Sequence, residues 1–104
     1  MKDDSFKDFV LDQLDELPEL ECRSMFGGYG LYQEEIFFGI IFQGRLYFKT
    51  NARSAVPYRK LGMKPFQPNR KQTLRNYYEV PVDIIEDCDR LTNWAREAVR
   101  VRKG

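Results

Sequence analysis

Residues 21–50 read ECRSMFGGYGLYQEEIFFGIIFQGRLYFKT, and this segment sets the fold class of the chain. Aromatic and β-branched residues are dense in it, and glycine or paired polar residues interrupt it at short intervals. This pattern favours strands joined by tight turns. The strand-like runs are residues 23–26, 29–33, 36–42 and 45–50. We expect an antiparallel meander, with a bulge or a positive-φ turn at Gly27-Gly28 because glycine is the default residue for both.

The segment before the meander predicts an amphipathic helix over residues 5–17. Its apolar side chains recur at helical spacing, and acidic side chains fill the opposite face. Ser5 can cap the start and Pro18 stops the helix. The apolar stripe, which we expect to pack in the core, consists of Phe6, Phe9, Val10, Leu14 and Leu17.

The segment after the meander predicts a second helix over residues 51–62 and then a hairpin. Ser54 is the better cap for this helix, and Gly62 stands where a helix commonly ends. Residues 64–68 and 72–80 have the pattern of two paired strands.

A last helix, capped by Asp83 or Asp89, completes the chain, since Leu91, Trp94 and Ala98 share one face. Runs of strands broken by single helices favour an α+β fold. We expect one domain over residues 1–104, in two layers, with an antiparallel sheet and the order α-β(3)-α-β(2)-α.

Charge is balanced overall but segregated along the chain. The 17 basic and 16 acidic residues give a net charge of +1, while residues 1–35 alone carry −7. No acidic residue lies between Glu35 and Glu79, and nine cations do. They are Arg45, Lys49, Arg53, Arg59, Lys60, Lys64, Arg70, Lys71 and Arg75. This basic segment either forms a positive face for nucleic acid or an acidic protein, or is neutralised by the acidic N-terminal helix folding back on it.

Alternation along two strands places cations and tyrosines on the side of the sheet that we expect to face solvent. The resulting candidate interaction surface consists of Arg45, Tyr47, Lys49, Arg75 and Tyr77. Such a surface suits nucleic acid, a protein interface, or an ordinary hydrated sheet face. The run 36–42 is apolar on both sides, so it is either covered on both or exposes a patch that a second copy would cover.

Catalytic and metal-binding motifs are not found in the sequence. Histidine is absent, which excludes histidine-based triads and histidine ligands. Cys22 and Cys88 form no C-x-x-C pair, and we expect two buried thiols in a cytosolic protein. A disulfide between them is the alternative, and it would require Cα atoms within about 7 Å. We therefore expect no enzyme activity, no metal and no cofactor. A small-molecule site is a weaker alternative, which a pocket opening on Gly27-Gly28 would favour.

Membrane insertion and secretion are not expected either. The longest apolar run has seven residues, Ile36 to Phe42, against the roughly 20 that a spanning helix needs. The N-terminus shows no apolar stretch behind a basic start, so we expect a cytoplasmic protein.

Five blocks of the sequence resemble, in order, the N-terminal domain of the TfoX/Sxy competence regulators. The first is the run from Arg23 to Tyr32, RSMFGGYGLY, which looks like the signature that opens this domain. The others are FGII at 38–41, LYFK at 46–49, Gly62 with Pro65-Phe66 and YYEVP at 77–81, and a closing Asp87 with Trp94-Ala95. The resemblance covers about residues 20–100.

This resemblance implies a two-layer α-β(3)-α-β(2)-α fold and a role in natural DNA transformation. The full-length regulators assist the cyclic-AMP receptor protein at competence promoters and carry a second, helical C-terminal domain. Because this chain stops at Gly104, we expect a stand-alone copy of the first domain. The family supplies no catalytic residues to carry over.

The signature residues are expected to serve structure. They are Arg23, Met25, Phe26, Gly27, Gly28, Tyr29, Gly30, Gly39, Tyr47, Lys49, Gly62, Pro65, Phe66, Tyr77, Tyr78, Val80, Pro81 and Trp94. We expect a regulatory interaction domain that contacts the transcription machinery, with the cyclic-AMP receptor protein or RNA polymerase as partner. The alternative is a non-specific nucleic-acid-binding domain that uses the basic segment, and homodimer formation stays open.

Overall fold

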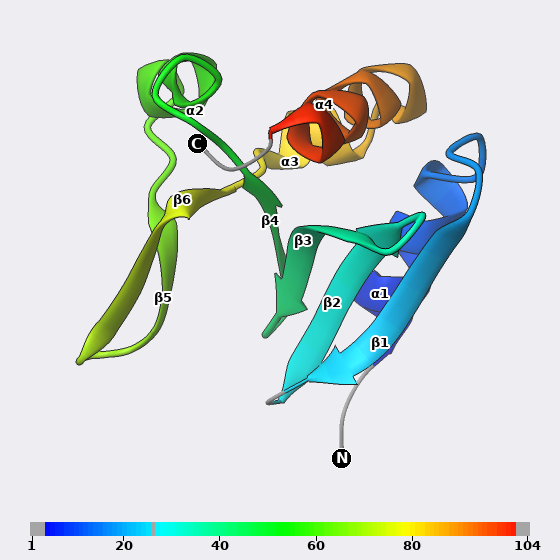
Figure 1. Cartoon of the computed structure of the whole chain (residues 1–104), viewed down its shortest axis with the longest axis horizontal. Coiled ribbons are helices and arrows are strands. Elements are labelled where there is room, and N and C mark those ends of the chain that lie inside the picture. The colour runs from blue at the N-terminus through cyan, green and yellow to red at the C-terminus, as the bar shows by residue number, and fades with distance from the viewer. Residues whose placement is uncertain (1–3, 26, 102–104) are drawn as a thin grey trace.

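The computed structural model describes residues 4–25 and 27–101 of the chain (Figure 1). Within those residues it has six strands and four helices. In chain order the elements are α1 (Ser5–Gln13), β1 (Leu20–Met25), β2 (Gly28–Gln33), β3 (Ile36–Phe42), β4 (Arg45–Lys49), α2 (Ala55–Lys60), β5 (Pro65–Asn69), β6 (Gln72–Glu79), α3 (Val82–Ile85) and α4 (Cys88–Arg100).

The strands form one open antiparallel sheet in the order β1-β2-β3-β4-β6-β5, which confirms the α+β class. The first run contains four strands and not three, because residues 20–25 pair with β2 along their whole length. Two helices close the chain in place of one. Asp87 separates them, and its carboxylate caps α4 by accepting a hydrogen bond from the Arg90 N–H at 3.2 Å. The predicted caps, Asp83 and Asp89, do not serve this helix.

The other predicted helices differ from the structure mainly in length. α1 ends at Gln13, four residues early, yet Leu14 and Leu17 in the following turns are still buried. Ser54 stands at the N-cap position of α2, but its side chain makes no cap hydrogen bond; the Asn51 Oδ1 instead accepts from the Arg53 and Ser54 N–H groups just before the helix. Gly62 follows the helix at φ +78°. Turns that keep an apolar side chain on the same side of the chain can replace the last helical turn without loss of burial.

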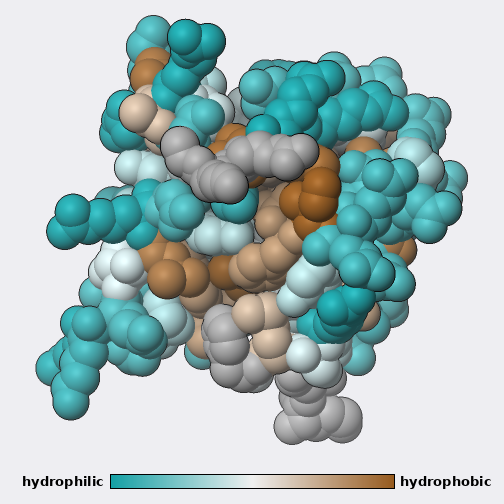
Figure 2. Space-filling view, viewed as in Figure 1, coloured by the Kyte–Doolittle hydropathy of each residue, from teal (hydrophilic) through white to brown (hydrophobic). Residues whose placement is uncertain are grey.

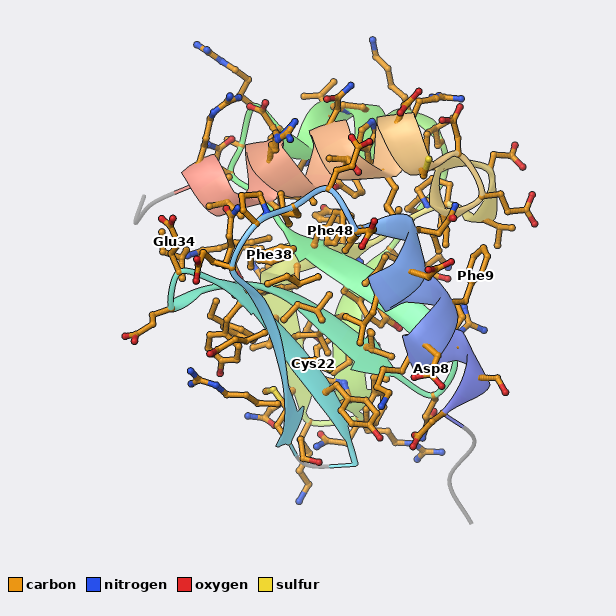
Figure 3. The ribbon with its side chains drawn as sticks, turned by 90° about the vertical axis from the view of Figure 1, so that its right-hand side faces the viewer. Asp8, Phe9, Cys22, Glu34, Phe38 and Phe48 are labelled. Carbon is orange, nitrogen blue, oxygen red and sulfur yellow. The ribbon has the colours of Figure 1, made fainter. Side chains whose placement is uncertain are left out.

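One face of the sheet carries the main core, beneath the helices (Figure 1). Figure 3 shows Phe38 and Phe48, both fully buried, in the layer between sheet and helices. Their rings lie 5.7 Å apart across β3 and β4. The chief helical contributions come from α1, α3 and α4. They include Val10, Ile84, Ile85, Leu91, Ala95 and Ala98.

The opposite face of the sheet carries a second, smaller and mainly aromatic cluster, formed by the buried residues Ile40, Tyr47, Phe66 and Tyr77. Strands β3 and β5 are three places apart in the sheet, about 14 Å if it were flat. The rings of Phe42 and Phe66 nevertheless lie 5.3 Å apart, so the sheet curls towards this face. Strand β3 therefore contributes side chains to a cluster on each side of the sheet. Of the two alternatives for its apolar pattern, cover on both sides is the one that the structure has.

Among the described residues, no helix has the length and apolar character that crossing a membrane requires.

Candidate functional site

The five residues of the predicted interaction surface do not form one open surface. Arg45 and Arg75 are exposed, and Lys49 is half-buried. Tyr47 and Tyr77 are only 8% and 6% exposed, so the expectation that they line a solvent-facing side is wrong. The cause is the curl of the sheet, which brings the Phe66 ring to 4.7 Å from that of Tyr47.

The electrostatics of these tyrosines follow from their burial. Removal from water raises the pKa of Tyr77 to about 12, because the charged phenolate is poorly solvated there. The pKa of Tyr47 is also raised, first by burial and then by the negative charge of Glu79. Arg45 donates to the same Glu79 carboxylate at 3.1 Å. Both rings are neutral packing elements at ordinary pH.

The exposed cations gather instead at one end of the molecule, which we call the basic end. Its side chains come from α2, from the segments before and after that helix, and from the β5–β6 hairpin, and all are exposed. They are Arg53, Arg59, Lys60, Lys64, Arg70, Lys71 and Arg75. Figure 2 shows hydrophilic side chains projecting from this part of the surface, at the left of the view. Within the described residues, none of the seven takes part in an ion pair.

The acidic side chains of the N-terminal segment lie elsewhere, in the part of the molecule formed by α1, β1 and β2, which we call the acidic end (Figure 1). Figure 1 places α1 behind β1 and β2, on the side opposite α2 and the hairpin. Asp8 on α1 is exposed, and Figure 3 shows it on the outer side of that helix. The alternative in which the acidic helix covers the basic segment is therefore wrong. Helix α1 instead packs on α4 and on the apolar sheet face, where Val10, Leu14 and Leu17 of its stripe are buried. Phe9 is 42% exposed, so the expectation that it packs in the core is wrong.

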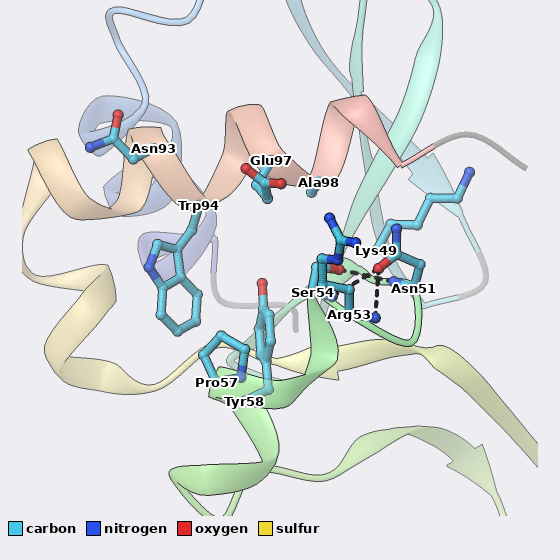
Figure 4. A pocket seen from close by; sticks show the side chains of 10 residues that line it. All are labelled: Lys49, Asn51, Arg53, Ser54, Pro57, Tyr58, Asn93, Trp94, Glu97 and Ala98. Carbon is cyan, nitrogen blue, oxygen red and sulfur yellow. Dashed lines mark hydrogen bonds between the residues drawn. The ribbon is translucent and has the colours of Figure 1, made fainter. Parts of the chain in front are cut away.

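A pocket of about 450 Å³ opens between α2 and α4, beside the basic end (Figure 4). Tyr58 and Trp94 form its apolar wall, with ring centroids 4.7 Å apart. Glu97 lies above the Tyr58 hydroxyl, while Lys49 and Arg53 lie at the other rim. Burial, and secondarily the charge of Glu97, raise the pKa of Tyr58, so its hydroxyl stays protonated.

This pocket offers hydrogen-bonding and charged groups, but no nucleophile with a positioned base. Sequence reasoning missed Tyr58 and Glu97, and placed Trp94 only in a structural role. The missing information is how α2 lies against α4, since the two helices are separated by a hairpin in the chain.

A second pocket, of about 300 Å³, opens beside Gly27 and Gly28. This is the position at which a pocket would favour the alternative of a small-molecule site. Phe6, Lys7 and Tyr29 also line it, and the Lys7 ammonium lies 5.0 Å from the centre of the Tyr29 ring. Lys7 is thus already engaged with the ring, and the remaining walls offer mainly backbone and apolar atoms.

The signature glycines occupy structural positions. Gly27 adopts φ +82° in the turn, as predicted for this pair. Gly28, Gly30 and Gly39 are buried within the sheet, where neighbouring strands leave little room for a side chain. Phe26 of the signature lies outside the described residues.

The two cysteines are free thiols in different settings. Cys22 is half-buried, and burial raises the pKa of its thiol. Cys88 is exposed at the start of α4, so the expectation of two buried thiols is wrong for this residue. Among the described residues no group of three acidic or thiol side chains is placed to hold a metal ion.

Comparison with known proteins places most of the chain in one family. The family model described as "TfoX N-terminal domain" matches residues 12–101. The chain is also 37% identical over 60 residues to the DNA transformation protein TfoX1 of Aliivibrio fischeri (strain ATCC 700601 / ES114). That match covers 56% of this chain and 29% of the relative, so the chain spans less than a third of the relative's length.

Proposed function

Because this chain belongs to the family of TfoX N-terminal domains, we propose that it is a regulatory domain of DNA transformation that works by binding a protein of the transcription machinery. The relative in Aliivibrio fischeri, named a DNA transformation protein, supports the process. A binding role fits the site, whose groups are arranged for contact and charge and include no catalytic pair. Such a partner would be met in the cytoplasm.

The observation that carries this proposal is the basic end. Seven exposed cations without an ion pair among the described residues are available to an acidic partner. Because Glu35 and Glu79 bound an acid-free stretch, no carboxylate of the same segment competes for them. Charge complementarity of this kind speeds association and selects the partner.

The burial of Tyr47 and Tyr77 favours a protein partner over a nucleic acid. Single-stranded nucleic acid is commonly held by aromatic rings on which bases stack, with cations along the backbone. Here the tyrosines that would stack are 8% and 6% exposed, so that face offers cations without a stacking platform.

The test uses purified cyclic-AMP receptor protein and RNA polymerase, each immobilised at low salt. We expect one of them to retain the chain. In the variant Arg59→Glu, Lys60→Glu, Lys64→Glu, retention should weaken about tenfold or more, because three positive charges of the basic end become negative. Failure of both partners to retain the parent chain would count against the proposal.

A matched control reverses three exposed charges at the acidic end, Asp8→Lys, Asp12→Lys and Asp15→Lys. If the basic end is the contact, this variant binds as the parent does. If binding follows net charge alone, the control binds more tightly, and the localised contact is contradicted.

Direct nucleic-acid binding is the second candidate, and the exposure of Arg70, Lys71 and Arg75 on the β5–β6 hairpin is what favours it. Titration with fluorescent single- and double-stranded DNA tests it. Binding through phosphates should weaken steeply with salt, with a slope near the number of phosphates neutralised. Charge reversal of Arg70, Lys71 and Arg75, the three exposed hairpin cations, should abolish it.

A further inference from the structure

The two edges of the sheet are unlike each other. Strand β5 forms one edge, and it carries Pro65 and Pro68, neither of which has an N–H to donate. Its register with β6 is also shifted twice within five residues. Prolines and bulges are common devices that keep an edge strand from pairing with another chain.

Strand β1 forms the other edge and lacks these devices. Its six residues, from Leu20 to Met25, include no proline and pair with β2 in one unbroken register. Among the described residues, no element pairs with its outer side. An edge of this kind is a ready template for a further strand.

The register identifies which backbone groups of β1 are unpaired. The Glu34 N–H donates to the Glu19 carbonyl at 3.2 Å, which marks this pair as hydrogen-bonded across the β1–β2 ladder. In antiparallel pairing the bonded residues alternate with unbonded ones. Residues 21 and 23 therefore bond to β2, while the N–H and C=O groups of Leu20, Cys22 and Ser24 point outward.

The charges of β1 make this edge complementary to itself. Glu21 and Arg23 share one face of the strand, are both exposed, and lie 2.7 Å apart. If two copies of β1 pair antiparallel about Cys22, each Glu21 stands opposite the Arg23 of the other copy. A shift by one pairing step in either direction would place Glu21 opposite Glu21, or Arg23 opposite Arg23. Like charges directly opposite are destabilising, so one register is selected.

We propose that β1 is a self-pairing edge: two copies of this chain join through antiparallel β1 strands, with Cys22 at the two-fold axis, into one continuous sheet. The outward N–H and C=O groups of Leu20, Cys22 and Ser24 supply the main-chain hydrogen bonds. The Glu21–Arg23 pairs, twice per dimer, set the register. In the monomer the Arg23 guanidinium lies 4.3 Å from the centre of the Tyr32 ring and pairs with Glu21 of its own chain, so on dimerisation it exchanges that Glu21 for the one of the second copy.

The expected dimer is weak and reversible. One six-residue strand per partner buries far less than the roughly 1,600 Å² of a standard stable interface. The dimer is also independent of the proposed regulatory function, since β1 lies at the acidic end and the proposed partner contact at the basic end (Figure 1).

Sedimentation and amide hydrogen exchange of the full chain, at concentrations raised to about 1 mM, test the proposal. We expect a monomer–dimer equilibrium in which the amides of Leu20, Cys22 and Ser24 become protected as concentration rises. The amides of Glu21 and Arg23 already bond to β2 and should change little. A chain that stays monomeric at the highest concentration, or a dimer without protection at β1, would overturn the proposal.

Charge exchange tests the register. Glu21→Arg and Arg23→Glu each turn two attractive pairs into repulsive ones, and each should raise the dimer dissociation constant about tenfold. The double variant Glu21→Arg, Arg23→Glu restores complementary pairs and should return the constant close to that of the parent. If the double variant is as weak as the singles, the register is wrong.

Ser24→Pro tests the main-chain contact separately from charge. It removes an outward N–H without touching the ladder to β2, so the monomer should fold normally by circular dichroism while the dimer is lost. Ser24→Ala keeps that N–H and is the matched control, with an unchanged dissociation constant. Equal dimerisation of the two variants would contradict pairing through this edge.

Discussion

Each face of the sheet carries a buried cluster, but the two clusters are covered by different means. The face under the helices is covered by α1, α3 and α4, which contribute residues from distant parts of the chain. The opposite face is covered by the sheet itself, since the curl brings β5 and β6 over β3. The difference indicates that a sheet with helices on one side only can still bury side chains on its other face, provided that aromatic rings from non-neighbouring strands contact each other there.

Removal of a ring from the helix-covered face should have the largest effect. Phe48→Ala leaves a cavity in the main core, where the ring is fully buried, and should cost about 4 kcal/mol of unfolding free energy. Urea unfolding measures this. Phe9→Ala is the control: that ring is 42% exposed on α1, and its loss should cost much less.

The equivalent change on the curled face should cost less. Phe66 is also fully buried, but its cluster is small and its strand lies at an edge, so Phe66→Ala should cost about 3 kcal/mol. Hydrogen exchange should show the loss concentrated in β5 and β6. A cost above that of Phe48→Ala would mean that the curled face, and not the helical layer, dominates stability.

Adding one methyl group to each face sharpens the comparison. A Cβ at Gly39 would lie 3.2 Å from the Phe48 ring and 3.2 Å from the Tyr47 backbone carbonyl oxygen. The three nearest atoms to a Cβ at Gly30 all belong to side chains: the Met25 sulphur at 2.7 Å and the Phe37 and Tyr32 rings at 3.1 and 3.2 Å. We expect Gly39→Ala to cost about 2 kcal/mol and Gly30→Ala about 1, because the Met25 side chain can move aside. Thermal unfolding of both variants decides the order, and the reverse order would contradict it.

The smallest effect is a dependence of stability on alkaline pH. As pH rises above 10.0, Tyr77 loses its proton in the unfolded chain, but in the folded protein it keeps it up to about 12. The unfolded state binds fewer protons in this window, so stability should fall as pH rises. Tyr77→Phe should show a shallower fall in the urea midpoint. An identical slope would mean that Tyr77 is not the buried group responsible.

Much of the fold was predictable because it rests on local patterns. The strand runs between residues 21 and 50, the start of α2 after Ser54 and the turn at Gly62 follow from side-chain periodicity and local residue preferences. Helix α1 was predicted too long because the spacing of Leu14 and Leu17 is satisfied equally well by turns that leave both buried.

The predicted site fared less well, and Tyr47 shows why. Alternation correctly separates it from Leu46 and Phe48, but alternation cannot say whether the second face meets solvent. That depended on Phe66, nineteen positions later, and on a curl that no local pattern encodes. The pocket between Tyr58, Trp94 and Glu97 depended likewise on the approach of two helices.

The sequence by itself determined the family, the strand and helix segments, and the segregation of acidic from basic residues, since all three are written in residue order. Only the tertiary structure decided that the two charged segments lie at opposite ends, that each sheet face carries a buried cluster, and that β1 and β5 are the edges. The physical reason is that burial and charge proximity depend on contacts between residues far apart in the chain. Such contacts form only when the strands have paired in register and the sheet has curled.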